Sequence, residues 1–397
     1  MIKKICSFLL VLMLMFCNAA ISAEEAADAG SENDGITAVT TAAEPVFDTD
    51  AKSYILMEAH SMKVLAEYNA DEGLPPASVT KIMMMLLVLE ALDSGKAKLD
   101  DTVTASAYAA SMGGSQIFLK EGEQMSLEDM FKSLVMASAN DAAVALAEHI
   151  YGSETACVTA MNERANELGL KNTLFENTNG LDDTTVDHKM SARDIAVITA
   201  EVVKHALVFD YSTEWMDTIR NGEFGLTNTN KLIRFYPGAT GMKTGSTSKA
   251  GFCITATAER DGLSLIAVIM GCSTKDTRNS LAKAMFDYGF ANYSYYSQDK
   301  TALDDARVVR GTAETVKTES DAFSAVLSRG ENKKVTSAAV YNDVIKAPLK
   351  TGDIVGRIDF FVGENKIGET PIRAAEEVDA ISYFSLLLHL LKNCLFI

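Results

Sequence analysis

The chain has 397 residues, 48% of them apolar, and carries a formal net charge of −18. Binding to a nucleic acid phosphate backbone requires a basic surface, so this acidic balance excludes DNA and RNA as partners. A chain of this length and apolar content buries one large core and a smaller one, so two domains are expected.

The first 23 residues have the layout of a secretory signal peptide. Two lysines precede an apolar run that reaches Phe16, and small residues follow up to Ala23. The run is too short to span a bilayer permanently, so the sequence predicts cleavage near Ala23 and an extracytoplasmic mature protein. Cys17 raises the alternative of a lipoprotein, which the bulky Phe16 before it disfavours. Residues 24–45 lack an apolar period and are expected to form a flexible spacer.

Strands and helices are both expected between residues 46 and 300. A strand hairpin is predicted at 54–58 and 63–68, and a buried apolar helix runs from Ser78 to Gly95. Apolar periods of a helix recur in four further segments, which are 126–138, the stretch after Asn140, 153–170 and 191–207. Paired strands at 252–259 and 263–271 precede a last helix at 275–290. This order predicts an α+β class, an antiparallel sheet sandwiched by helices.

The character of the sequence changes near residue 301. Short alternating runs separated by Gly, Asp and Asn fill residues 301–379 and predict a small all-β domain. The tail, residues 380–397, spaces its polar side chains three or four residues apart, at Ser382, Ser385, His389 and Lys392. This spacing predicts an amphipathic helix lying in the interface of a membrane leaflet. The alternative is a last helix that docks on the β-domain.

Neither the cysteines nor the histidines have the spacing of a metal site. Cys157, Cys253, Cys272 and Cys394 show no close pairing and are expected to be free thiols, although Cys253 and Cys272 lie on neighbouring predicted strands where a disulfide is conceivable. The five histidines are scattered. We therefore expect no metal and no organic cofactor.

Ser78-Val79-Thr80-Lys81 places a hydroxyl and an amine three residues apart in the first turn of a buried helix. Residues at this spacing share one helix face, so Lys81 lies within reach of Ser78 as its base. Burial lowers the pKa of a lysine, which allows Lys81 to accept the serine proton, and the helix amino terminus favours negative charge there.

Two further motifs follow in the chain. Ser138-Ala139-Asn140 falls at the break between two predicted helices, and Lys243-Thr244-Gly245 opens a predicted strand. Ser138 and Asn140 on their own are also compatible with turn and cap residues. The ordered set Ser-x-x-Lys, Ser-x-Asn, Lys-Thr-Gly resembles the signature of penicillin-binding proteins and serine β-lactamases.

The flanking sequences narrow this resemblance. The segments PPASVTKIM, MASANDAAVALAE, FENTNGLDD, SARDIA and GATGMKTGSTSKAGFC resemble the low-molecular-weight D-alanyl-D-alanine carboxypeptidases of the peptidase S11 family. The likeness covers residues 46–379 and the tail. It implies a β-lactamase/transpeptidase-like catalytic domain at 46–300, a C-terminal β-domain at 301–379, and a tail helix at 380–397 that attaches the exported enzyme to the outer face of the cytoplasmic membrane.

The resemblance also implies roles for the first two motifs. Ser78 corresponds to the nucleophile and Lys81 to its general base during acylation. Ser138 corresponds to a proton relay, and Asn140 to a group that holds the substrate amide. Ala139 stands where this family often has Gly, which puts little in doubt because the side chain at that position is not thought to be catalytic.

The third motif corresponds to the substrate-binding strand. Lys243 and Thr244 match residues that bind the terminal carboxylate of the substrate. Gly245 lets the strand lie close to the substrate backbone. The amides of Ser78 and Ser246 match an oxyanion hole.

The activity implied is removal of the terminal D-alanine from peptidoglycan stem pentapeptides through an acyl-enzyme on Ser78, with β-lactams as inhibitors that acylate the same serine. A β-lactamase would need a further carboxylate to activate water, and Glu176 is the candidate, but the FENTNG stretch around it favours the carboxypeptidase. A catalytically inactive relative is disfavoured by the intact motifs. The β-domain is also a candidate spacer or protein-binding module. Arg193 and Asp194 are expected to serve the fold.

Overall fold

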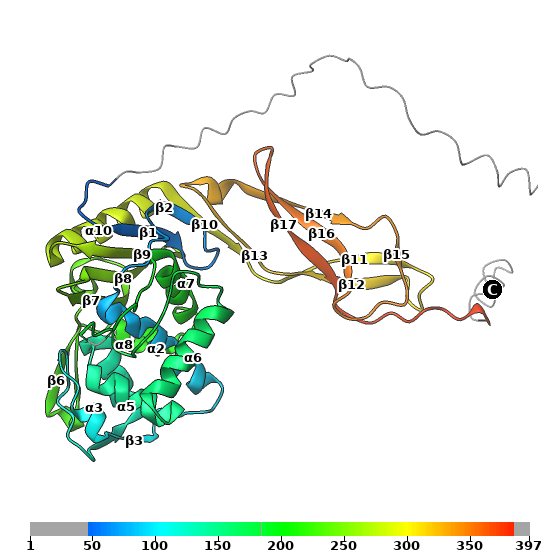
Figure 1. Ribbon diagram of the computed structural model, residues 1–397. Helices are drawn as coiled ribbons and strands as arrows, with labels where there is room; N and C mark the ends of the chain where they lie inside the picture. Colours follow the sequence, from blue (N-terminus) through cyan, green and yellow to red (C-terminus); the bar gives the residue numbers. More distant parts are fainter. Residues whose placement is uncertain (1–46, 184, 385–397) are drawn as a thin grey trace, which may run out of the picture. The chain divides into compact units, whose positions relative to one another are not determined.

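The computed structural model describes residues 47–183 and 185–384 (Figure 1). The predicted signal peptide at 1–23, the predicted spacer at 24–45, and residues 385–397 of the predicted tail helix lie outside the described residues, as do Cys17 and Cys394. In the described part of the chain, no helix has both the length and the apolar character needed to cross a membrane.

A five-stranded antiparallel sheet in the order β2-β1-β9-β8-β7 forms the centre of the first part of the chain (Figure 1). Its strands are β1 Ser53–Glu58, β2 Val64–Tyr68, β7 Ala239–Thr247, β8 Gly251–Arg260 and β9 Leu263–Cys272. The predicted hairpin and the predicted strand pair are both confirmed as β1–β2 and β8–β9. Among the strands that the structure describes, β7 pairs with β8 alone, so its other edge is open to the site described below.

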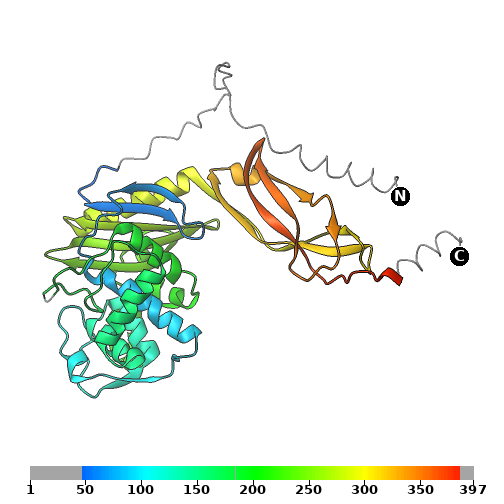
Figure 2. The same ribbon diagram turned by 45° about the vertical axis from the view of Figure 1, so that its right-hand side comes forward.

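The two faces of this sheet bury different cores. Apolar side chains of one face, including Ile254 and Ile269, pack on α10 Lys275–Asn292, and those of the other face, including Ile266 and Val268, pack on the remaining helices. Figures 1 and 2 show α10 on one side of the sheet and these helices on the other. The α+β class with a sheet between helices is therefore confirmed.

The same alternation of faces decides the question of the cysteine pair. Cys253 belongs to the core on the helical side and Cys272 to the core beneath α10, so the two side chains point to opposite faces of the sheet. Both are buried and free, as is Cys157. The alternative of a Cys253–Cys272 disulfide is wrong for this geometric reason.

The predicted helices form, with three local differences, one of which is that the helix expected at 191–207 ends at Val202 and a separate helix, α8 Leu207–Ser212, follows. The long helices are α2 Lys81–Asp93, α5 Asn140–Tyr151, α6 Glu154–Glu167 and α7 Ala192–Val202. The helix expected from Ser78 begins instead with a 3₁₀ turn, Ala77–Thr80, before α2. The helix expected at 126–138 is α4 Leu127–Lys132 followed by a π-helical turn, Ser133–Ala137, because its last residues widen toward Ser138.

Serine caps fix the starts of three of these helices. The side chains of Ser126, Ser153 and Ser191 each accept a hydrogen bond from the backbone N–H three residues later. The shorter elements of this part are β3 Thr102–Thr104, α3 Ala107–Ala110, β4 Gln124–Ser126, α8 Leu207–Ser212, β5 Met216–Ile219, β6 Phe224–Thr227 and α9 Leu232–Phe235.

The rest of the described chain is all-β, as predicted. Strand β10 Tyr293–Gln298 pairs with β13 Phe323–Ser328, and a six-stranded sheet has the order β14-β16-β17-β12-β11-β15. Its strands are β11 Thr301–Val309, β12 Thr315–Ser320, β14 Val335–Tyr341, β15 Ile345–Lys346, β16 Ile354–Val362 and β17 Asn365–Ala374. The domain boundary at residue 300 stays a prediction, since β10 before it pairs with β13 after it.

Candidate active site

The side chain of Lys81 is the centre of a buried polar cluster. Its Nζ lies 3.0 Å from Ser78 Oγ, 2.6 Å from Asn140 Oδ1 and 2.7 Å from the carbonyl oxygen of Asn179. Ser78 sits in the 3₁₀ turn and Lys81 opens α2, so the local helix geometry alone brings these two together. The amine of Lys81 is completely shielded from solvent.

Burial is the main reason why the pKa of Lys81 lies well below its ordinary value of 10.5. The positive charge of Lys243 lowers the pKa further, while the negative charge of Asp141 opposes both effects. A neutral amine beside a serine hydroxyl is the protonation state that a general base requires.

The second motif is shaped by the turn between the π-helical segment and α5. Ser138 adopts a left-handed conformation with φ of 61°, and Asn140 begins α5. Asn140 Nδ2 donates to the carbonyl of Gly113 at 2.6 Å, and its backbone N–H donates to the carbonyl of Ser115 at 2.7 Å. The hydroxyl of Ser138 is buried and has no hydrogen-bond partner among the described residues. A buried hydroxyl without a hydrogen bond lowers the stability of the fold, unless a bound ligand supplies the missing partner.

The third motif lies on the open edge strand β7. Lys243 is fully buried, and its Nζ donates to the carbonyl of Thr244 at 2.9 Å. Burial, together with the charge of Arg278, lowers the pKa of Lys243 from 10.5 to about 7. A Cβ on Gly245 would lie 2.8 Å from the carbonyl oxygen of Pro76 and 2.9 Å from the amide nitrogen of Ser78. Only glycine therefore allows β7 to lie this close to the turn that carries the serine.

These motifs meet at a cavity of about 280 Å³. Five of the eight predicted site residues line it, namely Ser78, Ser138, Thr244, Gly245 and Ser246. The other three, Lys81, Asn140 and Lys243, are buried, and the first two contact each other. The structure thus brings the eight predicted residues into one region.

Several residues of this region were missed by the sequence motifs. The cavity is also lined by Ser115, Thr229, Lys231, Lys275, Arg278 and Asn279. The charged members of its lining are all cations, which suits an anionic substrate group in a chain of net charge −18. The FENTNG segment contained a signal for Asn179, but its use of a backbone carbonyl could not be predicted. The cations on α10 and before β7 belong to none of the three motifs.

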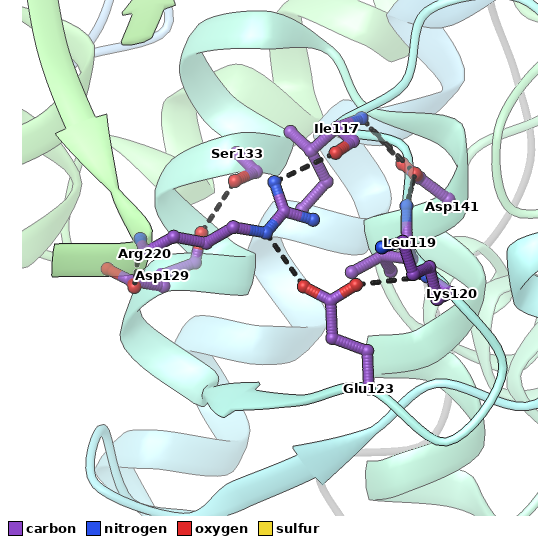
Figure 3. Close-up of polar contacts among 8 residues, drawn as sticks. All are labelled: Ile117, Leu119, Lys120, Glu123, Asp129, Ser133, Asp141 and Arg220. Atoms are coloured by element: carbon purple, nitrogen blue, oxygen red, sulfur yellow. Dashed lines mark hydrogen bonds and ion pairs between the residues drawn. The ribbon is translucent and has the colours of Figure 1, made fainter. Parts of the chain in front are cut away.

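Arg220 holds the loop around Ile117, which follows Gly113 and Ser115 in the chain; Figure 3 shows its contact with Ile117. Its Nε donates to Glu123 Oε1 at 2.7 Å and its Nη1 to the carbonyl of Ile117 at 3.0 Å. Figure 3 also shows Asp141, the neighbour of Asn140, accepting hydrogen bonds from the backbone of the same loop. Nothing in the sequence pattern indicated this role for Arg220, because its partners lie about a hundred residues away.

Glu176, the candidate carboxylate for a β-lactamase, is occupied elsewhere. Its two oxygens accept hydrogen bonds from the backbone N–H groups of Val186 and Asp187, at 2.7 and 3.1 Å. Glu176 does not belong to the residues that line the cavity. It closes a loop, as Asn177 does by accepting from the N–H of Gly180 at 2.7 Å.

Arg193 and Asp194 serve the fold, as expected. Arg193 pairs with Glu67 and Asp71, and Asp194 accepts from the backbone N–H of Asn172 at 2.8 Å. These contacts tie α7 to β2 and to the loop before Leu174, which forms an isolated β-bridge with Lys189.

A serine hydroxyl 3.0 Å from a buried lysine amine, beside an open antiparallel edge strand that carries Lys-Thr-Gly in its middle, is the arrangement of the serine acyl-transfer enzymes of the penicillin-binding type. Residues 38–274 match the peptidase S11 family, described as D-alanyl-D-alanine carboxypeptidase, and residues 290–380 match the C-terminal domain of penicillin-binding protein 5. The chain belongs to the peptidase S11 family of D-alanyl-D-alanine carboxypeptidases.

Individual relatives agree with this assignment. The D-alanyl-D-alanine carboxypeptidase DacF of Bacillus subtilis is 40% identical over 85% of this chain and 88% of its own, and DacA of Escherichia coli is 32% identical over 96% and 95%. The crystal structure of penicillin-binding protein 5 from Haemophilus influenzae superposes with a TM-score of 0.74 at 30% identity, covering 84% of this chain and 99% of that one. Penicillin-binding protein D2 of Listeria monocytogenes, solved with ampicillin bound, covers 62% of this chain at 27% identity with a TM-score of 0.57 and is itself covered completely.

The predicted activity is therefore confirmed at the level of reaction and substrate. The protein is a serine-type D-Ala-D-Ala carboxypeptidase that acts on peptidoglycan. Its family works on the cell wall, outside the cytoplasm.

Proposed function

We propose that the enzyme removes the terminal D-alanine from peptidoglycan stem pentapeptides through an ester formed on Ser78 Oγ. The observation that carries this assignment is the fully buried amine of Lys81, 3.0 Å from that oxygen. The roles below are those that the contacts support best.

The contacts of Lys81 suit the neutral amine. A neutral amine has two N–H donors and one lone pair, and the acceptors Asn140 Oδ1 and Asn179 O use the two donors. The lone pair is then left for the hydroxyl of Ser78. In acylation the hydroxyl proton passes to Lys81 Nζ while Ser78 Oγ bonds to the carbonyl carbon of the penultimate D-alanine.

The open edge of β7 suits the backbone of a bound peptide. An extended peptide adds to a free strand edge through main-chain hydrogen bonds, and the close approach at Gly245 brings the edge next to Ser78. The backbone N–H groups of Ser78 and Ser246 are assigned to the oxyanion of the tetrahedral intermediate.

The terminal carboxylate is assigned to Lys243 and Thr244, with Arg278 adding positive charge at the same cavity. The hydroxyl of Ser138, buried without a partner among the described residues, is assigned the relay: it gives its proton to the leaving amine and takes up the proton that Lys81 received from Ser78. The C–N bond then breaks, D-alanine leaves, and water hydrolyses the ester to free Ser78.

β-Lactams should acylate the same serine, since they present a carbonyl and a carboxylate in a similar arrangement. The charged side chains of the cavity lining are cations, and Glu176 is held by its loop, so no side chain described here is placed to activate water as a β-lactamase needs. We therefore expect a long-lived penicillin adduct.

The first test is intact-mass labelling of the mature protein with benzylpenicillin, followed by measurement of D-alanine released from a stem pentapeptide. The matched variant is Ser78→Ala. A single adduct that the variant lacks, together with D-alanine release by the wild type alone, supports the assignment. Labelling that survives in Ser78→Ala contradicts it.

Export and membrane attachment are also proposed rather than observed. The sequence of residues 1–23 supports export, and the polar spacing of residues 380–397 supports peripheral attachment to the outer face of the membrane. If so, a chain ending at residue 379 should leave the membrane fraction without detergent. Retention of that shortened chain would place the anchor elsewhere.

A further inference from the structure

A buried histidine links the turn that carries Ser78 to the loop of Glu176. His188 is 7% exposed. Its Nδ1 accepts the backbone N–H of Glu176 at 3.0 Å, and its Nε2 lies 2.7 Å from Thr80 Oγ1. Because Nδ1 is an acceptor, the proton of the neutral ring must sit on Nε2, and His188 donates to Thr80.

The direction of the next hydrogen bond follows. Thr80 Oγ1 accepts from His188, so its own proton is available for the carbonyl oxygen of Ala77, which lies 2.8 Å away. The hydroxyl is thereby locked in one orientation. The chain of donors runs from the backbone of Glu176 through His188 and Thr80 to the carbonyl of Ala77.

This carbonyl is in an unusual place. Ala77 has φ of +49°, a conformation that side-chain-bearing residues rarely adopt. Gly180 packs against it so closely that a Cβ would lie 1.9 Å from the Ala77 oxygen. A strained conformation of this kind persists only where the surroundings hold it, and here Thr80 and Gly180 both do so.

The Ala77 carbonyl belongs to the same planar peptide unit as the N–H of Ser78. In a trans peptide the C=O and N–H point in opposite directions, so fixing the oxygen fixes the direction of the N–H. That N–H is one of the two donors assigned to the oxyanion hole. Donors in such a site work because they are already oriented before the charge develops.

We propose that His188 is a positioning residue for the oxyanion hole, acting through Thr80 on the Ala77–Ser78 peptide. This inference rests on the proposed function of Ser78. It assigns no contact between His188 and the substrate. Its loss should therefore lower the rate of acylation while leaving binding of the terminal carboxylate at Lys243 and Thr244 nearly unchanged.

Two pairs of variants test this with the full mature enzyme. Thr80→Val removes the hydroxyl while keeping the shape of the side chain, and Thr80→Ser keeps the hydroxyl. His188→Asn can still accept from Glu176 at the place of Nδ1 but cannot reach Thr80, whereas the amide nitrogen of His188→Gln can occupy the place of Nε2 and donate to Thr80.

The readouts are kcat and KM for D-alanine release and the second-order rate constant of acylation by a fluorescent penicillin. Removing an oxyanion donor outright slows enzymes by about 10²- to 10³-fold, so misorienting one should cost about 10- to 100-fold in Thr80→Val and His188→Asn, mostly in kcat. Thr80→Ser and His188→Gln should stay within about 3-fold of wild type on the same scale.

The pairs separate positioning from a structural role. Equal losses in His188→Asn and His188→Gln, or wild-type acylation by Thr80→Val, would overturn the proposal. If the His188 variants do not fold, as judged by thermal unfolding, the nearly isosteric Thr80 pair decides alone. Ser78→Ala tests the proposed function separately. If that variant still forms a penicillin adduct, Ser78 is not the nucleophile, whatever the His188 and Thr80 variants show.

Discussion

The protonation of Lys243 should set the alkaline limit of the enzyme. Burial and the charge of Arg278 lower its pKa from 10.5 to about 7, which corresponds to about 5 kcal/mol in favour of the neutral amine at the free site. In the proposed role of Lys243 the charged form binds the substrate carboxylate, and this form exists below the pKa. Substrate capture, measured as kcat/KM, should therefore fall as pH rises through about 7.

The bound substrate should shift this limit. A carboxylate about 4 Å from the Lys243 ammonium contributes about 4 kcal/mol at an effective dielectric constant near 20, and this attraction raises the pKa of Lys243 in the complex. Because kcat reports groups in the enzyme–substrate complex, its alkaline limb should lie well above that of kcat/KM.

The assay is D-alanine release from a stem pentapeptide between about pH 5.5 and 10.5 at constant ionic strength. Lys243→Arg provides the matched control, since a guanidinium stays charged over this range. Its kcat/KM should lose the limb near pH 7, whatever its absolute rate. Arg278→Gln should move the wild-type limb upward, because it removes one cause of the lowered pKa. A limb that remains near pH 7 in Lys243→Arg would refute this reasoning and assign the limb to another group.

Three further outcomes follow from the geometry of the site. Gly245→Ala places a Cβ 2.8 Å from Pro76 O, so we expect the variant enzyme to lose about 1–3 kcal/mol of stability and most of its labelling by penicillin. An unchanged melting temperature and unchanged labelling would contradict the close approach of β7 to the turn that carries Ser78. Ser138→Ala removes a buried hydroxyl that has no partner among the described residues. Chemical denaturation should therefore show a stability equal to that of the wild type or higher by about 1 kcal/mol, while D-alanine release should fall by about 10²-fold or more. A loss of stability would show that the hydroxyl has a structural partner. Burial lowers the pKa of His188 from 6.5 to about 4, so its contribution to stability is complete above pH 6.5 and declines by up to about 3 kcal/mol as pH falls toward 4; urea unfolding of His188→Gln should lack this component, and an identical pH slope in both proteins would argue against it.

Much of the fold could be predicted because its signals are local. The strands β8 and β9 are mostly buried, largely apolar runs around the turn at Asp261 and Gly262, and serine caps mark the starts of α4, α6 and α7. The ordered motifs pointed to Ser78 and its neighbours for the same reason, and the structure brings these residues together. Within a short motif the distance between two side chains is set by their spacing in the chain. The helix start or edge strand on which the motif lies then sets where those side chains point.

The remaining parts of the site depend on contacts between distant segments. The π-helical turn before Ser138 and the left-handed conformation of that residue have no sequence signature comparable to a cap. Three contacts of the site join residues about 100 positions apart in the chain: they are made by Arg220, His188 and Asn179. Each depends on how the folded segments meet, and no local sequence pattern indicates it. Glu176 shows the reverse case, because its type and position suggested chemistry while its hydrogen bonds belong to a loop.

The complete burial of Lys81, the proposed base, can be explained from the two buried lysines together. In the free enzyme both burial and the charge of Lys243 lower the pKa of Lys81, with burial the larger cause. Once a substrate carboxylate pairs with Lys243, the two opposite charges largely cancel at Lys81, so the electrostatic help is lost when acylation must occur. Burial is then the effect that keeps Lys81 neutral. The carbonyl of Asn179, which accepts a hydrogen bond from Lys81 Nζ on the loop side, is part of this enclosure.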